Sequence, residues 1–302
     1  MPSFTSPSYL KEGDRVIILA PAKTTPQEKV QPAIALLRDW GLEVVEGKHL
    51  FTPWHQFGAK DEERLSDLQS ALDDPSIRAI FCVRGGYGSS RIVDGLRWEA
   101  FAKSPKWLIG YSDITVLHHA VLKQGVQSLH ATMPALFGED DPMSMEMLRQ
   151  TLFGESLTIE HNSHPLNRTG HVSGPVIGGN LSMLCHQVGT ATEPDTTGAI
   201  LFIEEVGEYL YAMDRMLVQL DRAGKLSHLK AIITGGFTAM KDQDLPFGES
   251  AEEILHRYAS KYDLPLALGL PFGHEPLNLP ILQGAVAELT INEELSRLAF
   301  KG

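Results

Sequence analysis

The first half of the chain alternates short apolar runs with amphipathic segments, and this alternation limits the fold more than any other feature of the sequence. Residues 15–20 (RVIILA) form an apolar, β-branched run that is typical of a buried strand. Three further runs of this kind lie at residues 42–45, 79–83 and 107–109. Because helical patterns separate these runs, the sequence predicts a parallel α/β sheet.

The helices between these strands have recognisable ends. Thr25 and Pro26 suit the cap and the first position of a helix, and Glu28 completes a capping box. We expect this helix to end at Trp40, before Gly41. Two more helices are predicted, at residues 61–72 and 113–123.

The alternation lapses in a polar segment near the middle of the chain, between about residues 154 and 173. We therefore expect an N-terminal α/β domain over residues 1–155, a linker over 156–172 and a C-terminal domain over 173–302. The second half resumes with a helix opened by Asn180. A helix is predicted at residues 209–223, and further strands are predicted at residues 199–203, 231–235 and 285–291.

The charge balance is acidic. Lys and Arg number 26 against 38 Asp and Glu, which gives a formal net charge of −12, and there is no long run of basic residues. Nucleic-acid and anionic-membrane binders carry clustered basic residues, so neither partner is expected. No stretch approaches the roughly 18 apolar residues of a membrane span, and the N-terminus lacks a secretory pattern, so we expect a cytoplasmic protein.

The sequence offers little for a disulfide or a metal. Its two cysteines, Cys82 and Cys185, lie in apolar stretches and are interpreted as buried thiols. Two cysteines cannot form a disulfide framework or a cysteine-based zinc site. We expect no metal and no cofactor.

Residues 106–115 (KWLIGYSDIT) carry an apolar strand through Gly110 directly into a helix. A sharp turn of this kind lifts a serine hydroxyl out of the sheet and places it at the positive end of the helix, so Ser112 is a candidate nucleophile. The match to a Gly-x-Ser-x-Gly turn is partial, because Ile114 stands in place of the second glycine. The alternative is that Ser112 only caps the helix.

A glycine-rich segment, residues 84–91 (RGGYGSSR), follows another predicted strand. Its glycines allow close backbone approach, and its amides can face an anion or a developing oxyanion. The segment lacks the spacing of a phosphate-binding Walker motif and that of a dinucleotide-binding fingerprint. The alternative is a plain turn at the end of a strand.

An acid and a base accompany these two segments. Glu204 and Glu205 end a predicted strand, where carboxylates of α/β sheets often face the ligand, and His274 lies in a loop rich in Gly and Pro. Each also has a simpler interpretation, as a solvated strand end or an ordinary loop histidine. His118 and His119 are expected to be packing or surface residues. Together the four segments supply the nucleophile, oxyanion loop, acid and base of a serine hydrolase.

Five segments in this order, VRGGYGSSR, IGYSDIT, GGNLSML, LFIEEVGEYLYAMDRML and GLPFGHE, resemble the LD-carboxypeptidase (murein tetrapeptide carboxypeptidase) family of serine peptidases. The N-terminal LKEGDRVIILAPA also resembles the family's opening strand, so the likeness covers nearly the whole chain. The resemblance implies a catalytic triad of Ser112, Glu204 and His274. It further implies an oxyanion hole formed by backbone amides near Gly86 and Asp113.

The resemblance also implies a fold and a substrate. Family members have an N-terminal domain like class I glutamine amidotransferases and a smaller, β-rich C-terminal domain, with the active site between them, and they are usually homodimers. They release terminal D-Ala from cytoplasmic murein peptides by cleaving an L,D-amide bond. Arg84, Gly85 and Tyr87 are the candidates to bind this substrate, with Arg84 on a substrate carboxylate.

Two alternatives remain open. A related branch, the microcin self-immunity peptidases, shares the triad and hydrolyses peptidyl- or aminoacyl-nucleotide analogues. Chains of that branch are usually longer, with an added loop near the site, and no such insertion is evident in 302 residues, so the sequence favours the carboxypeptidase. The second alternative is a non-catalytic ligand-binding module, which predicts that Ser112, Glu204 and His274 do not converge.

Overall fold

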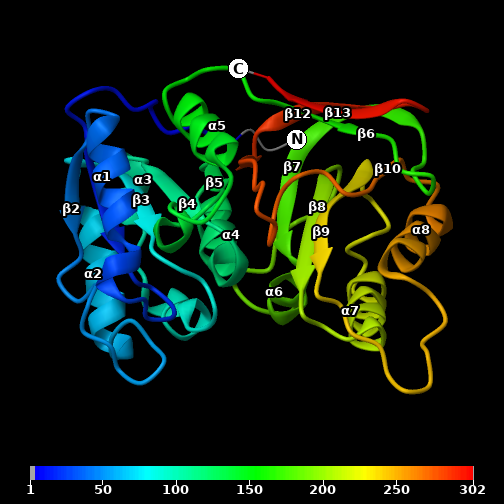
Figure 1. Ribbon diagram of the computed structural model, residues 1–302, viewed down its shortest axis with the longest axis horizontal. Helices are drawn as coiled ribbons and strands as arrows, with labels where there is room; N and C mark the ends of the chain where they lie inside the picture. The colour runs from blue at the N-terminus through cyan, green and yellow to red at the C-terminus, as the bar shows by residue number, and fades with distance from the viewer. Residues whose placement is uncertain (1–3, 302) are drawn as a thin grey trace.

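The computed structural model describes residues 4–301 and arranges them around two sheets that lie side by side (Figure 1). The first sheet has the strand order β11-β5-β4-β3-β1-β2. Its five N-terminal strands are parallel, as the alternating pattern predicted, and β11 joins them antiparallel. The strands are β1 (Arg15–Leu19), β2 (Glu43–Glu46), β3 (Ile77–Cys82), β4 (Trp107–Gly110), β5 (Ser128–His130) and β11 (Ile281–Gln283).

Helices cover both faces of this first sheet. Apolar side chains of α2, α3 and α4 pack against one face, and those of α1 and α5 pack against the other. A sheet that is buried on both faces needs apolar residues at nearly every strand position, which explains the continuous apolar runs in the sequence. The helices are α1 (Gln31–Asp39), α2 (Asp61–Asp73), α3 (Glu99–Lys103), α4 (Thr115–Lys123) and α5 (Pro142–Leu152).

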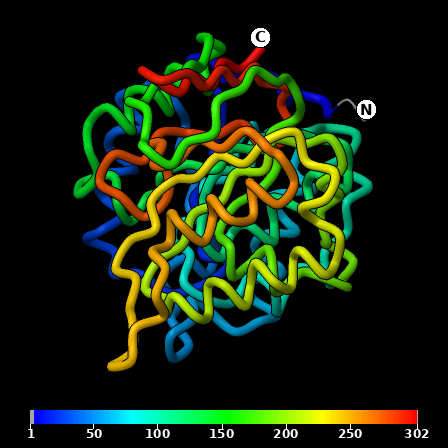
Figure 2. Tube along the Cα trace, turned by 90° about the vertical axis from the view of Figure 1, so that its right-hand side faces the viewer, coloured from blue at the N-terminus to red at the C-terminus, as the bar shows by residue number. Residues whose placement is uncertain are grey.

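The second sheet is mixed, with the strand order β10-β9-β8-β7-β12-β13-β6. The long strand β7 pairs in parallel with β8 and antiparallel with β12. Helices α6, α7 and α8 pack on one face, and Figure 2 shows α7 and α8 in front of the strands. The elements are β6 (Thr158–Asn162), β7 (Gly170–Asn180), α6 (Leu181–His186), β8 (Ile200–Val206), α7 (Leu210–Arg222), β9 (Ala231–Thr238), α8 (Ala251–Lys261), β10 (Leu266–Ala267), β12 (Val286–Ile291) and β13 (Leu295–Phe300).

The first helix is shorter than its capping pattern predicted. A 3-10 turn, η1 (Gln27–Lys29), precedes α1, and the Thr25 hydroxyl is buried with no hydrogen-bond partner in residues 4–301. Pro32 explains the break, because proline has no backbone N–H to donate to the carbonyl of Glu28. The remaining 3-10 turns are η2 (Ser89–Arg91), η3 (Val93–Gly95), η4 (Ser112–Ile114) and η5 (Pro134–Leu136).

The polar segment 156–172, which we expected to be a linker, contributes to the second sheet. It contains β6, which pairs with β13, and the first residues of β7. Strand β6 lies at the edge of the sheet, and most of its side chains are exposed. An edge strand does not need the apolar pattern of a buried one, so its sequence resembles a loop.

The two halves of the molecule are joined by buried polar contacts as well as by the chain. Strand β11 comes from the C-terminal part of the sequence and extends the first sheet. From β11, Gln283 donates to the carbonyl of Gly178 at 2.8 Å, and His119 of α4 also reaches this carbonyl, at 2.9 Å. The fold is therefore a two-domain α/β fold whose domains share a bonded junction.

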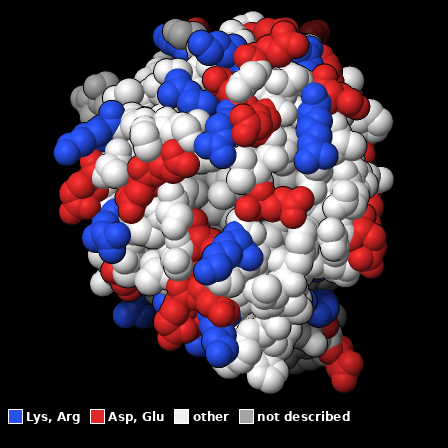
Figure 3. All heavy atoms as spheres, turned by 90° about the vertical axis from the view of Figure 1, so that its left-hand side faces the viewer, with Lys and Arg blue, Asp and Glu red and all other residues white. Residues whose placement is uncertain are grey.

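The surface and the thiols agree with an ordinary globular chain. Figure 3 shows one face of the N-terminal half, where basic and acidic side chains alternate. Cys82 and Cys185 are both buried and free, as expected. Across residues 4–301, no helix is both long and apolar enough to cross a membrane.

Candidate active site

Ser112 lies at the turn between β4 and α4, in the short 3-10 turn η4. Its φ of 63° is in the left-handed region, which costs energy for a residue other than glycine and occurs at functional turns. The residue in the cap position is Tyr111, and no side chain caps the turn. The interpretation of Ser112 as a helix cap is therefore wrong, and its side chain lines a pocket instead.

Two glycines make room for this turn. A Cβ atom at Gly110 would lie 3.0 Å from a side-chain carbon of Ile114, and one at Gly85 would lie 3.0 Å from Cβ and 3.2 Å from Oγ of Ser112. The glycine-rich loop therefore passes directly against Ser112, the candidate nucleophile, where a larger residue in place of Gly85 would displace the serine.

The side chain of Asp113 ties the glycine-rich loop to the serine turn. Its Oδ2 atom accepts a hydrogen bond of 2.8 Å from the backbone N–H of Ser89, and the residue is buried. In the same loop, the N–H of Gly86 makes no hydrogen bond to another backbone group of residues 4–301. A free, fixed amide on the pocket that Ser112 also lines is what an oxyanion hole requires. From the sequence only the backbone amide of Asp113 was predicted to matter, and this anchoring role of its side chain was not.

The candidate acid and base form a bonded pair. His274 Nδ1 lies 2.6 Å from Glu204 Oε2, which joins the loop after β10 to the end of β8. Glu204 is fully buried, and Gly273 packs so closely that a Cβ there would lie 2.8 Å from Glu204 Cβ. When Nδ1–H donates to the carboxylate, Nε2 is left as the proton acceptor. His274 lines the same pocket as Ser112.

The pKa of His274 reflects two opposing causes. Burial favours the neutral ring and by itself lowers the pKa. The hydrogen bond to Glu204 and the negative charges of Glu204 and Glu205 act in the other direction, and the net pKa is above its ordinary value. The pair is thus arranged to stabilise the imidazolium that forms when a base takes a proton.

The neighbouring Glu205 has a different role. Its carboxylate accepts hydrogen bonds from Asn180 at 2.9 Å and from the hydroxyl and backbone N–H of Ser182 at 2.6 and 2.8 Å. These bonds hold the start of α6, which Asn180 caps as predicted. The two glutamates do not form a metal site, and no group of three or more potential ligands for a metal occurs in residues 4–301.

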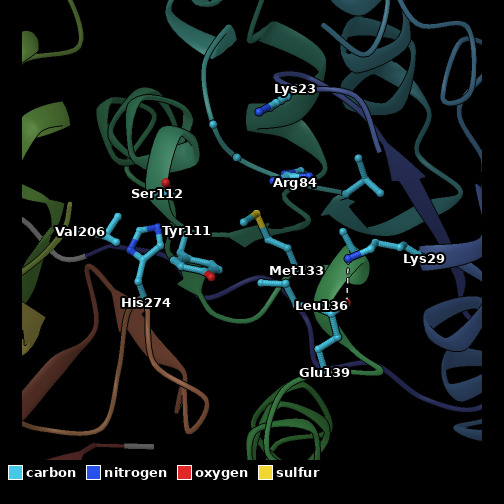
Figure 4. Close-up of a pocket in the computed structure, with 14 residues that line it drawn as sticks. Lys23, Lys29, Arg84, Tyr111, Ser112, Met133, Leu136, Glu139, Val206 and His274 are labelled. Carbon is cyan, nitrogen blue, oxygen red and sulfur yellow. Dashed lines mark hydrogen bonds and ion pairs between the residues drawn. The ribbon is translucent and has the colours of Figure 1, made fainter. Parts of the chain in front are cut away.

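Ser112 and His274 open onto one pocket of about 430 Å³ (Figure 4). In Figure 4 the pocket extends from these two residues, past Arg84, to Lys29 and Glu139. Ser112 and the Glu204-paired His274 thus line the same pocket, although no hydrogen bond joins the Ser112 hydroxyl to His274 among residues 4–301. The lining residues are Lys23, Lys29, Val83, Arg84, Gly85, Gly86, Tyr111, Ser112, Met133, Ala135, Leu136, Glu139, Val206 and His274.

Of the three candidates for substrate binding, Arg84, Gly85 and Tyr87, only two line the pocket. Arg84 and Gly85 line the pocket, whereas Tyr87 is absent from its lining and is 46% exposed. The Tyr87 ring packs on the surface against Phe57, with ring centroids 5.9 Å apart. Positive φ angles at the glycines on either side of Tyr87 turn the backbone, so its side chain leaves the pocket.

Comparison with known proteins identifies the family. Sequence models of the LD-carboxypeptidase N-terminal and C-terminal domains match residues 16–131 and 173–289. The chain belongs to the LD-carboxypeptidase family. The probable murein peptide carboxypeptidase of Bacillus subtilis is 33% identical over 95% of this chain and 92% of its own. The murein tetrapeptide carboxypeptidase of Pseudomonas aeruginosa is 32% identical over 92% and 94%.

Solved structures share the LD-carboxypeptidase fold. The muramoyltetrapeptide carboxypeptidase of Oxalobacter formigenes superposes with a TM-score of 0.88 at 32% identity, over 95% of this chain and 99% of that one. The microcin C7 self-immunity protein MccF, in complex with aspartyl sulfamoyl adenosine, gives a TM-score of 0.85 at 20% identity over 99% of both chains. The second likeness concerns the fold alone. By family, the protein is an enzyme, a serine-type LD-carboxypeptidase.

Buried histidines support the site of this LD-carboxypeptidase from behind. His118 Nε2 lies 2.8 Å from the carbonyl of Gly110, at the start of the serine turn. His130 is fully buried and packs against the ring of Tyr111, with ring centroids 5.6 Å apart, and Tyr111 in turn packs edge-on against His274. Of the two expectations for His118 and His119, packing or surface, the structure confirms packing, whereas the burial of His130 was not predicted from the sequence. For His118 and His119, the sequence signal of burial is their position among mostly apolar residues of one helix, TVLHHAVL.

Proposed function

We propose that this protein is a serine carboxypeptidase that hydrolyses the L,D-amide bond of murein tetrapeptides and releases terminal D-Ala. The observation that supports this most directly is the position of Ser112, held at φ 63° on the pocket that also receives the Glu204-paired His274. A serine needs an adjacent base to become a nucleophile, and the base needs a group that orients it.

In the proposed reaction, His274 Nε2 accepts the proton of Ser112 as Oγ attacks the carbonyl carbon of the L-residue. The backbone N–H groups of Gly86 and Asp113 donate hydrogen bonds to the negatively charged carbonyl oxygen. The C–N bond then breaks, and His274 donates its proton to the nitrogen of D-Ala. A water molecule next loses a proton to His274 and hydrolyses the acyl-serine ester, which restores the Ser112 hydroxyl.

The charge of the pocket supports an anionic substrate. Arg84 and Lys23 line it, and neither has an ion-pair partner within the described residues. The Lys23 stem packs against Gly86, where a Cβ would lie 3.0 Å from Lys23 Cβ. We infer that Arg84 binds the C-terminal carboxylate, because a guanidinium matches a carboxylate with two parallel hydrogen bonds. The positive charges of Arg84 and Lys23 attract an anionic substrate to the pocket, although the chain as a whole carries a net charge of −12.

Mass spectrometry tests the proposal. The protein is incubated with a murein tetrapeptide that ends in meso-diaminopimelyl-D-Ala, and we expect a product that has lost one D-Ala. Ser112→Ala should keep its circular-dichroism spectrum and lose at least about four orders of magnitude in kcat. Ser66→Ala, an exposed serine outside the pocket, is the matched control and should retain full activity. Full activity of Ser112→Ala would refute the assignment.

The second candidate function is hydrolysis of peptidyl- or aminoacyl-nucleotide analogues by the same residues. The likeness in fold to MccF supports it, and since that superposition spans 99% of both chains, chain length does not separate the two functions. The higher identity to the muramoyltetrapeptide carboxypeptidase, 32% against 20%, favours the peptide substrate. Faster turnover of aspartyl sulfamoyl adenosine than of the tetrapeptide would reverse this ranking.

The family resemblance supports three further proposals. We propose a cytoplasmic enzyme of peptidoglycan recycling, an N-terminal domain related to class I glutamine amidotransferases, and a homodimer. Analytical ultracentrifugation tests the last of these, because a dimer has twice the 33.2 kDa mass of the chain.

A further inference from the structure

The far end of the pocket carries a paired positive and negative charge. Lys29 Nζ donates to Glu139 Oε1 at 2.7 Å, and both side chains line the pocket that contains Ser112. Their side chains are 46% and 56% exposed, so both remain open to a ligand. Figure 4 places the pair across the pocket from Ser112 and His274.

The wall between the two ends is apolar. Val83, Met133, Ala135 and Leu136 line it, and Figure 4 shows Met133 and Leu136 between Tyr111 and the Lys29–Glu139 pair. A pocket of about 430 Å³ is larger than a terminal alanine needs. The rest of the space is therefore available to the residue on the acyl side of the cleaved bond, and its apolar wall suits a chain of methylene groups.

We propose that the Lys29–Glu139 pair binds an ammonium–carboxylate centre at the end of the acyl-side residue. This inference rests on the proposed function, whose substrate already carries meso-diaminopimelate in third position, and it assigns the recognition of that zwitterionic side chain to Lys29 and Glu139. The ammonium group binds Glu139 and the carboxylate binds Lys29, so each charge of the ligand meets its opposite. Arg84 remains for the C-terminal carboxylate.

The Lys29–Glu139 pair contributes little to the stability of the fold. It joins η1 to the segment after η5 across a solvent-exposed gap, and an exposed ion pair of this kind contributes about 0–1 kcal/mol to stability. Lys29→Met and Glu139→Gln should therefore fold normally. Any large effect on activity would then come from substrate binding.

Three tetrapeptides that differ only in the third residue test the proposal. The residues are meso-diaminopimelate with both charges, L-lysine with the ammonium alone, and L-norleucine with neither. Lys29→Met should lower kcat/KM about tenfold for the diaminopimelate peptide and spare the other two. Glu139→Gln should lower it about tenfold for the diaminopimelate and lysine peptides and spare the norleucine peptide.

A matched control separates this site from a general surface effect. Glu146→Gln removes a comparable exposed pair with Arg149 outside the pocket, and it should leave all three substrates unaffected. Equal losses on all three peptides, or no loss on the diaminopimelate peptide, would overturn the inference while Ser112-dependent D-Ala release still upholds the proposed function. Absence of D-Ala release from all three peptides by the unmodified enzyme would instead refute the proposed function itself.

Discussion

At Ser112 the backbone is held in a conformation that costs a residue with a side chain about 1–3 kcal/mol. The surrounding structure sustains this cost, because β4 and α4 are buried on both sides of the turn and His118 binds the carbonyl of Gly110. As a result, the Ser112 side chain lines the pocket and does not cap the helix. The chemistry of the site therefore depends on the positions of individual side-chain atoms.

Glu204→Gln tests the role of the acid through a pH profile. In the native enzyme the pKa of His274 is above its ordinary value, and a general base must be neutral, so kcat/KM should rise with pH through that raised pKa. Without the carboxylate, burial dominates and lowers the pKa, so the acidic limb should move to lower pH while kcat falls about 10²–10⁴-fold. An acidic limb that stays in place would show that Glu204 does not govern His274.

Arg84→Ala tests the proposed carboxylate contact. We expect kcat/KM for the tetrapeptide to fall about 10- to 100-fold, because a hydrogen-bonded charge contributes about 1.5–3 kcal/mol. A tetrapeptide with a C-terminal amide lacks this carboxylate, so the variant and the native enzyme should process it at similar rates. Unchanged kinetics on the free acid would remove Arg84 from the site.

At the scale of elements, the serine turn and the glycine-rich loop act as one unit. The loop follows β3 and the turn follows β4, and these adjacent parallel strands end at the same edge of the sheet. Asp113 then fixes their relative position through its bond to the N–H of Ser89. A fixed loop holds the Gly86 amide in one place, as the proposed oxyanion hole requires.

Substitutions at Asp113 test this coupling of the two loops. Asp113→Ala leaves a buried N–H without a partner and should lower the free energy of unfolding by about 1–3 kcal/mol, as measured in urea, together with kcat. Asp113→Asn retains an acceptor oxygen and should keep most of both. If Asp113→Ala lost stability and kept full kcat, the bond to Ser89 would be structural only.

At the scale of the whole molecule, buried histidines lie between the two sheets and make the fold sensitive to acid. Burial lowers the pKa of His118 and of His119 to about 4, and it holds the pKa of His130 well below the ordinary range. These histidines bind protons at higher pH in the unfolded chain than in the folded one. Their contribution to the free energy of unfolding is therefore complete above about pH 6.5 and is lost as the pH falls toward 4. The junction formed by His119 and Gly178 should therefore weaken in acid.

A comparison of urea unfolding at pH 7 and pH 5 measures this effect. Each histidine with a pKa of about 4 should cost up to about 2 kcal/mol of stability at pH 5. His119→Gln should be less stable at pH 7 but should lose about 2 kcal/mol less than the native protein on going to pH 5. Ser66→Ala, at an exposed position without a titratable group, is the control and should leave the pH dependence unchanged. A native pH dependence in His119→Gln would contradict the assignment.

Local patterns predicted most elements because their causes are local. Alternating apolar runs predicted the parallel strands of the first sheet, and Asn180 predicted the start of α6. The prediction was wrong where partners distant in the sequence decide the structure. Strand β6 looks polar because it lies at a sheet edge and pairs with β13, more than a hundred residues away. Likewise, Pro32 outweighed the capping pattern at Thr25.

The sequence by itself determined the α/β class, the family resemblance and the residue types from which the site is built. The resemblance singled out Glu204, but only the tertiary structure showed how it differs from Glu205: the two adjacent residues of one strand bind different partners that the rest of the fold provides. It also turned Tyr87 away from the pocket and brought Lys29 and Glu139 together at the far end of it. The physical reason is that contacts between distant segments depend on how the sheets and helices pack, which no local pattern records.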